Sequence, residues 1–122
     1  MKKLLALCAM LALLVPALAF PAGSVAEAKL GKSIVDRKIA DETTTFAPGE
    51  KAYLWLKVEG AAGETLTVTW KINDQAYPAT LNVGGTPWRT WASKTLHIAG
   101  EWTVTVADAA GTTMNETRFT VK

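Results

Sequence analysis

The stretch that decides the fold runs from Leu66 to Ile72 and reads Leu-Thr-Val-Thr-Trp-Lys-Ile. Large apolar side chains occupy every second position, and threonine or lysine stands between them. Successive side chains of a β-strand point to opposite faces, so this alternation predicts a strand with one buried and one solvent-facing side. Valine, threonine and tryptophan are also residue types that strands favour.

The same alternation recurs along the chain, and no stretch repeats apolar residues at the spacing of a helix. Turn-forming pairs such as Pro48-Gly49 and Gly84-Gly85 separate the runs at intervals of roughly 10 to 14 residues, near the spacing of β-sandwiches. The sequence therefore predicts an all-β chain of about seven strands. An antiparallel immunoglobulin-like β-sandwich is the first choice, and a small β-barrel is the alternative. The expected strands lie around residues 33–39, 52–58, 66–72, 79–83, 89–98, 102–106 and 119–121.

The N-terminus has the features of a signal peptide. Lys2 and Lys3 precede an apolar run from Leu4 to Val15, which ends at Pro16. This run of about 12 residues is shorter than the ~20 that a membrane-spanning helix needs, which favours a cleaved signal over an anchor. We therefore expect a periplasmic or secreted protein with no stable membrane span after signal cleavage.

Two stretches fit a signal peptidase site, Ala17-Leu18-Ala19 and Ala26-Glu27-Ala28. We prefer the second, because Pro21 follows the first cut closely. Cleavage there divides the chain into a signal peptide, residues 1–28, and a single β-sandwich domain, residues 29–122. Residues 20–31 are rich in small residues, so the part that survives cleavage is expected to be a flexible tail.

Composition excludes several classes of function. Cys8 is the only cysteine, so the domain has neither disulfides nor a zinc ligand set. Thirteen Lys and Arg face eleven Asp and Glu, a net charge of +2. The cations form no block along the sequence, and phosphate binding needs concentrated positive charge, so a nucleic acid is not expected as a partner.

No pattern of catalytic residues stands out. The only histidine, His97, follows Ser93 by four positions, which in an extended strand places the two more than ~12 Å apart. A serine nucleophile, its base and an orienting carboxylate must instead converge. We therefore expect no enzyme, no cofactor and no metal, and an uncharacterised enzyme ranks last among the alternatives.

Five tryptophans in so short a chain are its most informative residues. Trp70 and Trp102 fall in register with aliphatic neighbours and are expected in the core. Trp55 instead shares a face with Tyr53, opposite Leu54 and the other aliphatic residues of its strand.

Trp88 and Trp91 are three positions apart, so a regular strand sends them to opposite faces. One of them can be core, and the other must be exposed or covered by a loop. Arg89 shares a face with Trp91 and can place its guanidinium beside the indole.

These aromatics define the candidate binding surface. Exposed Trp, Tyr and Arg side chains are favoured anchors of protein interfaces, and aromatic rings also stack on sugars. The sequence thus predicts a non-catalytic binding module of the cell envelope, first for a protein partner and alternatively for an envelope glycan. Another interpretation, left open here, is that the N-terminal segment or neighbouring loops partly cover these aromatics, so that they serve packing. The oligomeric state is open. The candidate contacts are Tyr53, Trp55, Trp88, Arg89 and Trp91.

Several motifs resemble those of one bacterial family. Gly85 to Lys94 has the form Gly-x-x-Trp-Arg-x-aromatic-x-Ser-Lys, and Gly100 to Val104 has the form Gly-x-Trp-x-Val. With Ile34 to Arg37 before them and Gly111 to Val121 after, they are similar to the domain-of-unknown-function family DUF2914. The resemblance implies a compact exported or membrane-tethered β-sandwich without known catalytic residues. The family's frequent His-x-Trp is replaced here by Val68-Thr69-Trp70.

Overall fold

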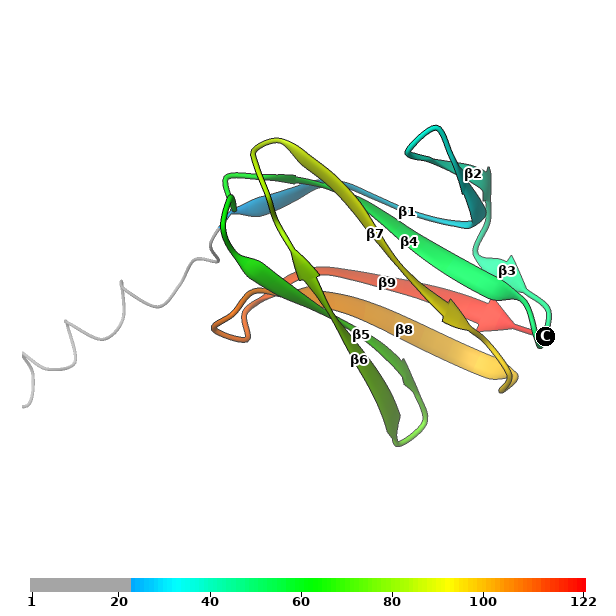
Figure 1. Ribbon diagram of the computed structural model, residues 1–122. Coiled ribbons are helices and arrows are strands. Elements are labelled where there is room, and N and C mark those ends of the chain that lie inside the picture. Colours follow the sequence, from blue (N-terminus) through cyan, green and yellow to red (C-terminus); the bar gives the residue numbers. More distant parts are fainter. Residues whose placement is uncertain (1–22) are drawn as a thin grey trace, which may run out of the picture.

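The computed structural model describes residues 23–122, which form two antiparallel sheets packed face to face (Figure 1). The first sheet has the strand order β2-β1-β4-β7 and the second the order β3-β9-β8-β5-β6. The short β3 runs parallel to β9. The strands are β1 (Ser24–Val35), β2 (Lys38–Glu42), β3 (Thr45–Phe46), β4 (Lys51–Glu59), β5 (Thr65–Ile72), β6 (Gln75–Asn82), β7 (Trp88–Thr95), β8 (Gly100–Ala107) and β9 (Thr113–Val121).

This architecture confirms the predicted all-β class and the β-sandwich, and the sheets do not close into a barrel. The described residues contain no helix, and so none that is long and apolar enough to cross a membrane. Residues 1–22 of the predicted signal peptide lie outside the described residues, and its last six residues, 23–28, lie within them.

The core lies between the sheets and contains the side chains that the alternation assigned to it. Leu66, Val68, Trp70 and Ile72 of β5 are each at most 2% exposed. Pairing of β5 with β8 places Trp70 beside Val104, so apolar residues of neighbouring strands line up on one face.

Aromatic rings fill one end of this core. The ring of Trp102 stacks on that of Phe119, with centroids 6.0 Å apart. Phe46 and Trp70 meet Phe119 edge-on at 5.6 and 5.9 Å. Such offset and edge-to-face contacts are the geometries that aromatic pairs prefer. The predicted core positions of Trp70 and Trp102 are therefore correct.

Residues 23–122 contain nine strands, rather than the predicted seven or so. The run at residues 33–39 is the end of β1 and the start of β2, joined by a tight turn at Asp36 and Arg37. Both turn residues have positive φ, 52° and 61°, although neither is a glycine or asparagine. Such turns favour Asn, Asp or Gly followed by Gly, and Arg37 stands where that glycine is expected, so the sequence did not predict this hairpin. The two-residue β3 was too short to predict.

The expectation of a flexible tail at residues 20–31 is wrong for its described part. β1 begins at Ser24 and pairs with β4 from Ser24 opposite Glu59 to Gly31 opposite Tyr53. The predicted domain boundary between Ala28 and Lys29 thus lies in the middle of a strand. Small residues are tolerated there because the ladder of backbone hydrogen bonds, rather than large side chains, holds this end of β1.

Candidate functional site

Strand register gathers four of the five candidate residues, all but Trp88, on the outer face of the first sheet, which turns away from the core. Trp55 of β4 lies between Lys29 of β1 and Trp91 of β7. In the next row, Lys57 of β4 is paired with Arg89 of β7. Alternation along β4 places both rows on the side opposite the buried Leu54 and Leu56. We call this surface the basic face.

The β1–β2 hairpin folds over the middle of the basic face. The indole N–H of Trp55 donates a hydrogen bond to the carbonyl oxygen of Arg37 at 2.9 Å. The Arg37 guanidinium lies over the ring of Trp91, 5.8 Å from its centroid. Trp55 is consequently only 5% exposed, although it points away from the core.

Gly31 permits this close approach. A Cβ at Gly31 would stand 2.7 Å from both the carbonyl oxygen of Ala40 and the Cγ1 of Ile39. Any other residue would therefore push β2 away from β1. The packing of the hairpin on Trp55 therefore depends on glycine at position 31.

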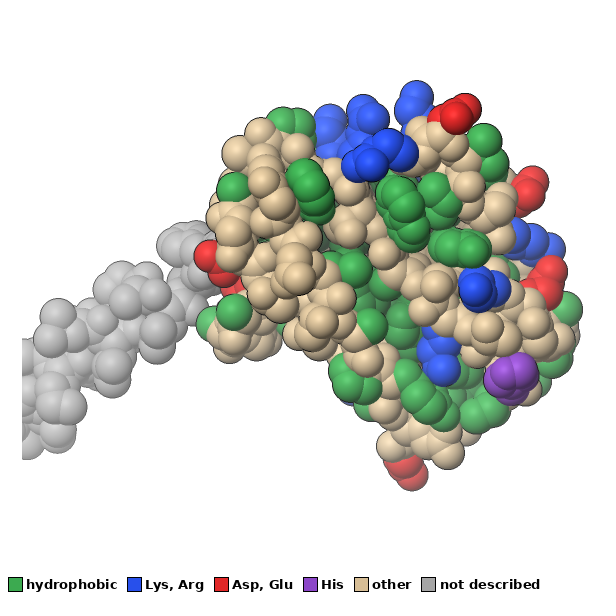
Figure 2. Space-filling view, in the orientation of Figure 1, with side chains coloured by type: hydrophobic (Ala, Val, Ile, Leu, Met, Phe, Trp, Pro, Cys, Tyr) green, Lys and Arg blue, Asp and Glu red, His purple; other side chains and the backbone are tan. Residues whose placement is uncertain are grey.

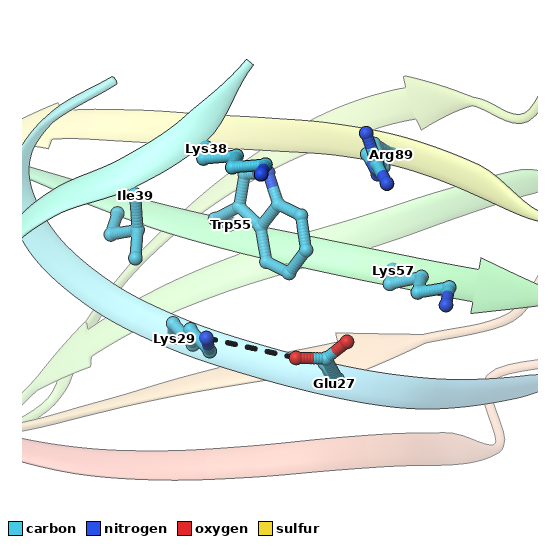
Figure 3. A pocket seen from close by; sticks show the side chains of 7 residues that line it. All are labelled: Glu27, Lys29, Lys38, Ile39, Trp55, Lys57 and Arg89. Carbon is cyan, nitrogen blue, oxygen red and sulfur yellow. Dashed lines mark ion pairs between the residues drawn. The ribbon is translucent and has the colours of Figure 1, made fainter. Parts of the chain in front are cut away.

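One hollow of about 320 Å³ opens on the basic face beside Trp55 (Figure 3). Its walls come from four strands, and we call it the Trp55 hollow. Figure 3 shows the indole lying across the middle of the group, with Lys57 and Arg89 on neighbouring strands. Its one carboxylate, Glu27, pairs with Lys29 at 3.7 Å. The lining residues are Glu27, Lys29, Lys38, Ile39, Trp55, Lys57 and Arg89.

A second hollow of about 330 Å³ adjoins the first and contains no carboxylate among its lining residues. It is lined by Arg37, Lys57, Pro87, Trp88 and Arg89, and we call it the Trp88 hollow. Two of these, Lys57 and Arg89, also line the Trp55 hollow. The two hollows therefore meet at a shared pair of cations.

The basic face concentrates positive charge. Together the two hollows contain five Lys and Arg side chains and one Glu. The ion pairs of residues 23–122 involve Lys29, Lys32 and Arg118, so the cations shared by the two hollows have no carboxylate within ion-pair distance. Figure 2 shows Lys and Arg side chains gathered along the top of the molecule.

The outer face of the second sheet differs in charge. Its hollow is lined by one lysine, Lys71, and two glutamates, Glu101 and Glu116, together with an asparagine and two threonines. The positive charge is thus a property of one face, and the overall net charge of +2 conceals it. An acidic ligand is attracted to the first sheet rather than to the second.

The candidate aromatics lie on the faces that the alternation predicted. Trp55 is buried because the hairpin covers it, which agrees with the interpretation that another segment of the chain covers this face. One expectation, the position of Arg89, needs correction. The guanidinium over Trp91 belongs to Arg37, whereas Arg89 lines the two hollows.

The remaining candidates are half-buried. Trp88 packs against the core, and Trp91 lies on the opposite, outer side. This arrangement agrees with the prediction that one of the two is core and the other is covered or exposed. Tyr53, the fifth candidate, has the ammonium of Lys51 over its ring at 5.9 Å.

Sequence reasoning missed most of the cations. Lys57 could be placed, since it shares a face with Trp55 in an alternating strand. Lys29 lay in the segment interpreted as a tail, and Arg37 and Lys38 lay in the unpredicted hairpin. These cations come together because β1 pairs with β4 and β2 pairs with β1, and no local sequence pattern predicts that pairing.

A third hollow of about 400 Å³ opens between β6 and β7, the edge strands of the two sheets (Figure 2). Ser93 and His97 both line it, but no carboxylate does. Lys94, on the core-facing side of β7, holds its ammonium 3.9 Å from the ring centroid of Tyr77. An inward-facing lysine in β7 and Pro78 in β6 are features that protect sheet edges against pairing with other chains.

The described residues do not form a cluster of metal-ligating side chains. Within residues 23–122, no three His, Cys, Asp or Glu side chains are grouped so that they could hold a metal ion. The chemistry available on the basic face is therefore that of ammonium and guanidinium groups, which donate hydrogen bonds to anions.

Two packed antiparallel sheets with a basic outer face define the chain as a small β-sandwich domain. Residues 63–121 match the model of DUF2914, a family described as proteins of unknown function. This match confirms the resemblance inferred from the Gly-x-x-Trp-Arg and Gly-x-Trp motifs. It covers β5 to β9, so the Ile34–Arg37 motif lies outside it.

A solved structure shares the fold. The Pseudomonas fluorescens alkylpurine DNA glycosylase AlkC, bound to DNA containing an abasic site analog, is similar with a TM-score of 0.52 and 13% sequence identity. The similarity covers 85% of this chain and 31% of the glycosylase, so the chain spans less than a third of that protein's length. At this identity the likeness shows the fold alone. No curated protein matches the chain.

Proposed function

We propose that the chain is a non-catalytic binding module of the bacterial cell envelope that holds an acidic glycan on its basic face. One observation carries the proposal: two adjoining hollows share Lys57 and Arg89, and the single carboxylate that lines them is already paired with Lys29. Cations without carboxylate partners at a concave surface attract anionic ligands.

Size favours a glycan over the protein partner that the sequence placed first. Each hollow measures about 320 to 330 Å³, at the lower end of the range for small-ligand sites. A protein partner typically covers a broad patch of about 800 Å². The half-buried ring of Trp88 supplies apolar surface in its hollow against which a sugar can lie.

Export and the absence of catalysis are parts of the same proposal. The N-terminal lysines followed by an apolar run support export, to the periplasm or beyond the cell. The hollow that contains Ser93 and His97 has no carboxylate to orient the histidine, which supports binding rather than catalysis.

An acidic protein surface is the second candidate. Arg37 over Trp91 forms an aromatic and guanidinium pair beside the hollows. Trp and Arg are the residues that most often anchor protein interfaces. An acidic protein segment would then use the same cations.

The test compares three soluble polymers on the purified domain by titration calorimetry. Polygalacturonate carries a carboxylate on each sugar, dextran carries none, and poly-glutamate carries carboxylates on a peptide chain. We expect polygalacturonate to bind, dextran not to bind, and poly-glutamate to bind at least 10-fold more weakly. Binding should weaken as salt rises, because ions screen exposed charges within ~10 Å at 0.1 M.

Two charge-reversal variants locate the site. Lys57→Glu should abolish polygalacturonate binding, and Lys71→Glu, the same change on the other sheet, should leave it intact. Equal losses in both variants would mean that binding follows net charge and not the basic face. Tighter binding of poly-glutamate would favour the protein partner instead.

A further inference from the structure

We infer that the two hollows bind consecutive units of one glycan chain, and that Lys57 and Arg89 hold the anionic group where those units join. The inference rests on the proposed function and adds a stated ligand geometry to it. Its starting point is the sharing of these two cations between the hollows.

Lys57 and Arg89 are direct partners in the β4–β7 ladder. Side chains of such partners leave the sheet on the same face, close enough to contact one anion together. On the other side of Lys57, its partner in β1 is Glu27. That carboxylate pairs with Lys29 at 3.7 Å, which leaves the side toward Arg89 free for a ligand.

The hairpin supplies one further cation to each hollow. Arg37 lines the Trp88 hollow, and the next residue, Lys38, lines the Trp55 hollow. The carbonyl of Arg37 is fixed by the Trp55 indole, and its guanidinium lies over Trp91. The hairpin thus gives each hollow one cation of its own, Arg37 or Lys38, in addition to Lys57 and Arg89, which both hollows share.

The chemistry of the shared pair defines the ligand class. Arg89 presents a planar fork suited to two oxygens of one group, and Lys57 adds a point charge. A carboxylate on a sugar ring and a phosphodiester between two sugars both present such oxygens. The ligand is therefore a glycan with one anionic group at or beside each linkage.

A length series tests the inference. Galacturonic acid, its α-1,4-linked dimer and its trimer are titrated against the ¹⁵N-labelled domain, and the dissociation constants are read from amide shifts. The dimer should bind at least 10-fold more tightly than the monomer, since it fills both hollows. The trimer should add no more than about twofold, as a third unit finds no third hollow.

Variants test whether Lys57 and Arg89 cause the tighter binding of the dimer. Lys57→Gln and Arg89→Gln should each remove the advantage of dimer over monomer, whereas Lys71→Gln should keep it. An oligomer of glycerol phosphate serves as the second arm. Tighter binding of that oligomer with the same variant pattern identifies a phosphodiester ligand, and weaker binding identifies a carboxylated one; both support the shared site.

Other results would overturn it. An affinity that rises by the same factor with every added unit, or a dimer advantage that survives Lys57→Gln, would show a diffuse charge effect without two subsites. If the dimer binds no better than the monomer while polygalacturonate still requires Lys57, only this inference fails and the proposed function stands. If no acidic polymer binds, the proposed function fails as well.

Discussion

At the scale of single residues, Trp55 shows how a surface position becomes a buried one. Its place in the alternation of β4 directs it away from the core, yet it is 5% exposed. The cause is a contact between residues 18 positions apart, the hydrogen bond from its indole to Arg37. Alternation predicts which side of a strand a residue occupies, but not what other segments lie on that side.

Truncation should separate Trp55 from Trp91. Trp55→Ala removes a buried ring and the anchor of the hairpin, so we expect a loss of about 3–5 kcal/mol in the free energy of unfolding. Trp91→Ala removes a half-buried ring and should cost roughly 1–2 kcal/mol. Urea denaturation of both variants measures the difference. Equal losses would contradict the covered position assigned to Trp55.

Glu50 gives the clearest pH dependence at this scale. A hydrogen bond from the Ala47 backbone N–H, at 2.7 Å, is the largest cause that lowers the pKa of Glu50 below its usual range. The ammonium of Lys32, at 3.2 Å, lowers this pKa further. A lowered folded-state pKa adds stability that is present above the unfolded value, ~4.3 for glutamate, and is lost as pH falls through the folded value.

The stability difference between the wild-type chain and Glu50→Gln should therefore shrink as the pH falls below about 4.3. Denaturation at a series of pH values measures it, and an NMR titration of the Glu50 carboxyl carbon gives the pKa directly. A midpoint in the ordinary range of glutamate would contradict the role of the Ala47 hydrogen bond.

At the scale of elements, the β1–β2 hairpin makes the site. It covers Trp55 and brings Arg37 and Lys38 to the hollows. The long alternating strands were predictable from residue patterns alone, as the burial of β5 shows. The hairpin was not, because its turn uses Asp36 and Arg37 at positive φ. Tertiary contacts with Trp55 and Trp91 compensate for that unfavourable backbone.

Gly31→Ala tests whether the hairpin needs the close approach of β2 to β1 at Gly31. The new Cβ would stand 2.7 Å from backbone and side-chain atoms of β2, so we expect a loss of about 1–3 kcal/mol in stability. It should also make the Trp55 indole more accessible, so that acrylamide quenches its fluorescence more strongly. The matched control is Gly85→Ala, whose Cβ meets only ordinary contact distances and should cost about 0.5 kcal/mol. Unchanged quenching in Gly31→Ala would show that the hairpin does not need this close approach.

At the scale of the whole molecule, the strand topology places cations and carboxylates that are interspersed along the sequence on different faces. Cations far apart in the chain, from Lys29 to Arg89, meet on one face, while Glu101 and Glu116 lie on the other. The cations form no block along the sequence and the net charge is +2, so no concentrated positive charge was predicted. The basic face nevertheless concentrates it, because charge density depends on which strands become neighbours.

The N-terminal strand provides a prediction at the same scale. The fragment 29–122 lacks the part of β1 that pairs with β4 between Ser24 and Ala28, and it lacks Glu27. We expect it to unfold at a lower urea concentration than the fragment 20–122, which keeps the strand whole. With the proposed export, mass spectrometry of the cleaved chain should accordingly find Phe20 rather than Lys29 as the first residue. Equal stability of the two fragments would support cleavage after Ala28 instead.

The central claim is that an acidic glycan lies on the basic face, and the five indole N–H signals offer the most direct measurement of it. A ¹H–¹⁵N spectrum is recorded while galacturonic acid trimer is added to the labelled domain. The account predicts shifts of the Trp55, Trp88 and Trp91 indole signals, with those of Trp70 and Trp102 unchanged. Shifts confined to Trp70, which lines the hollow between β6 and β7, or no shifts at all, would contradict it.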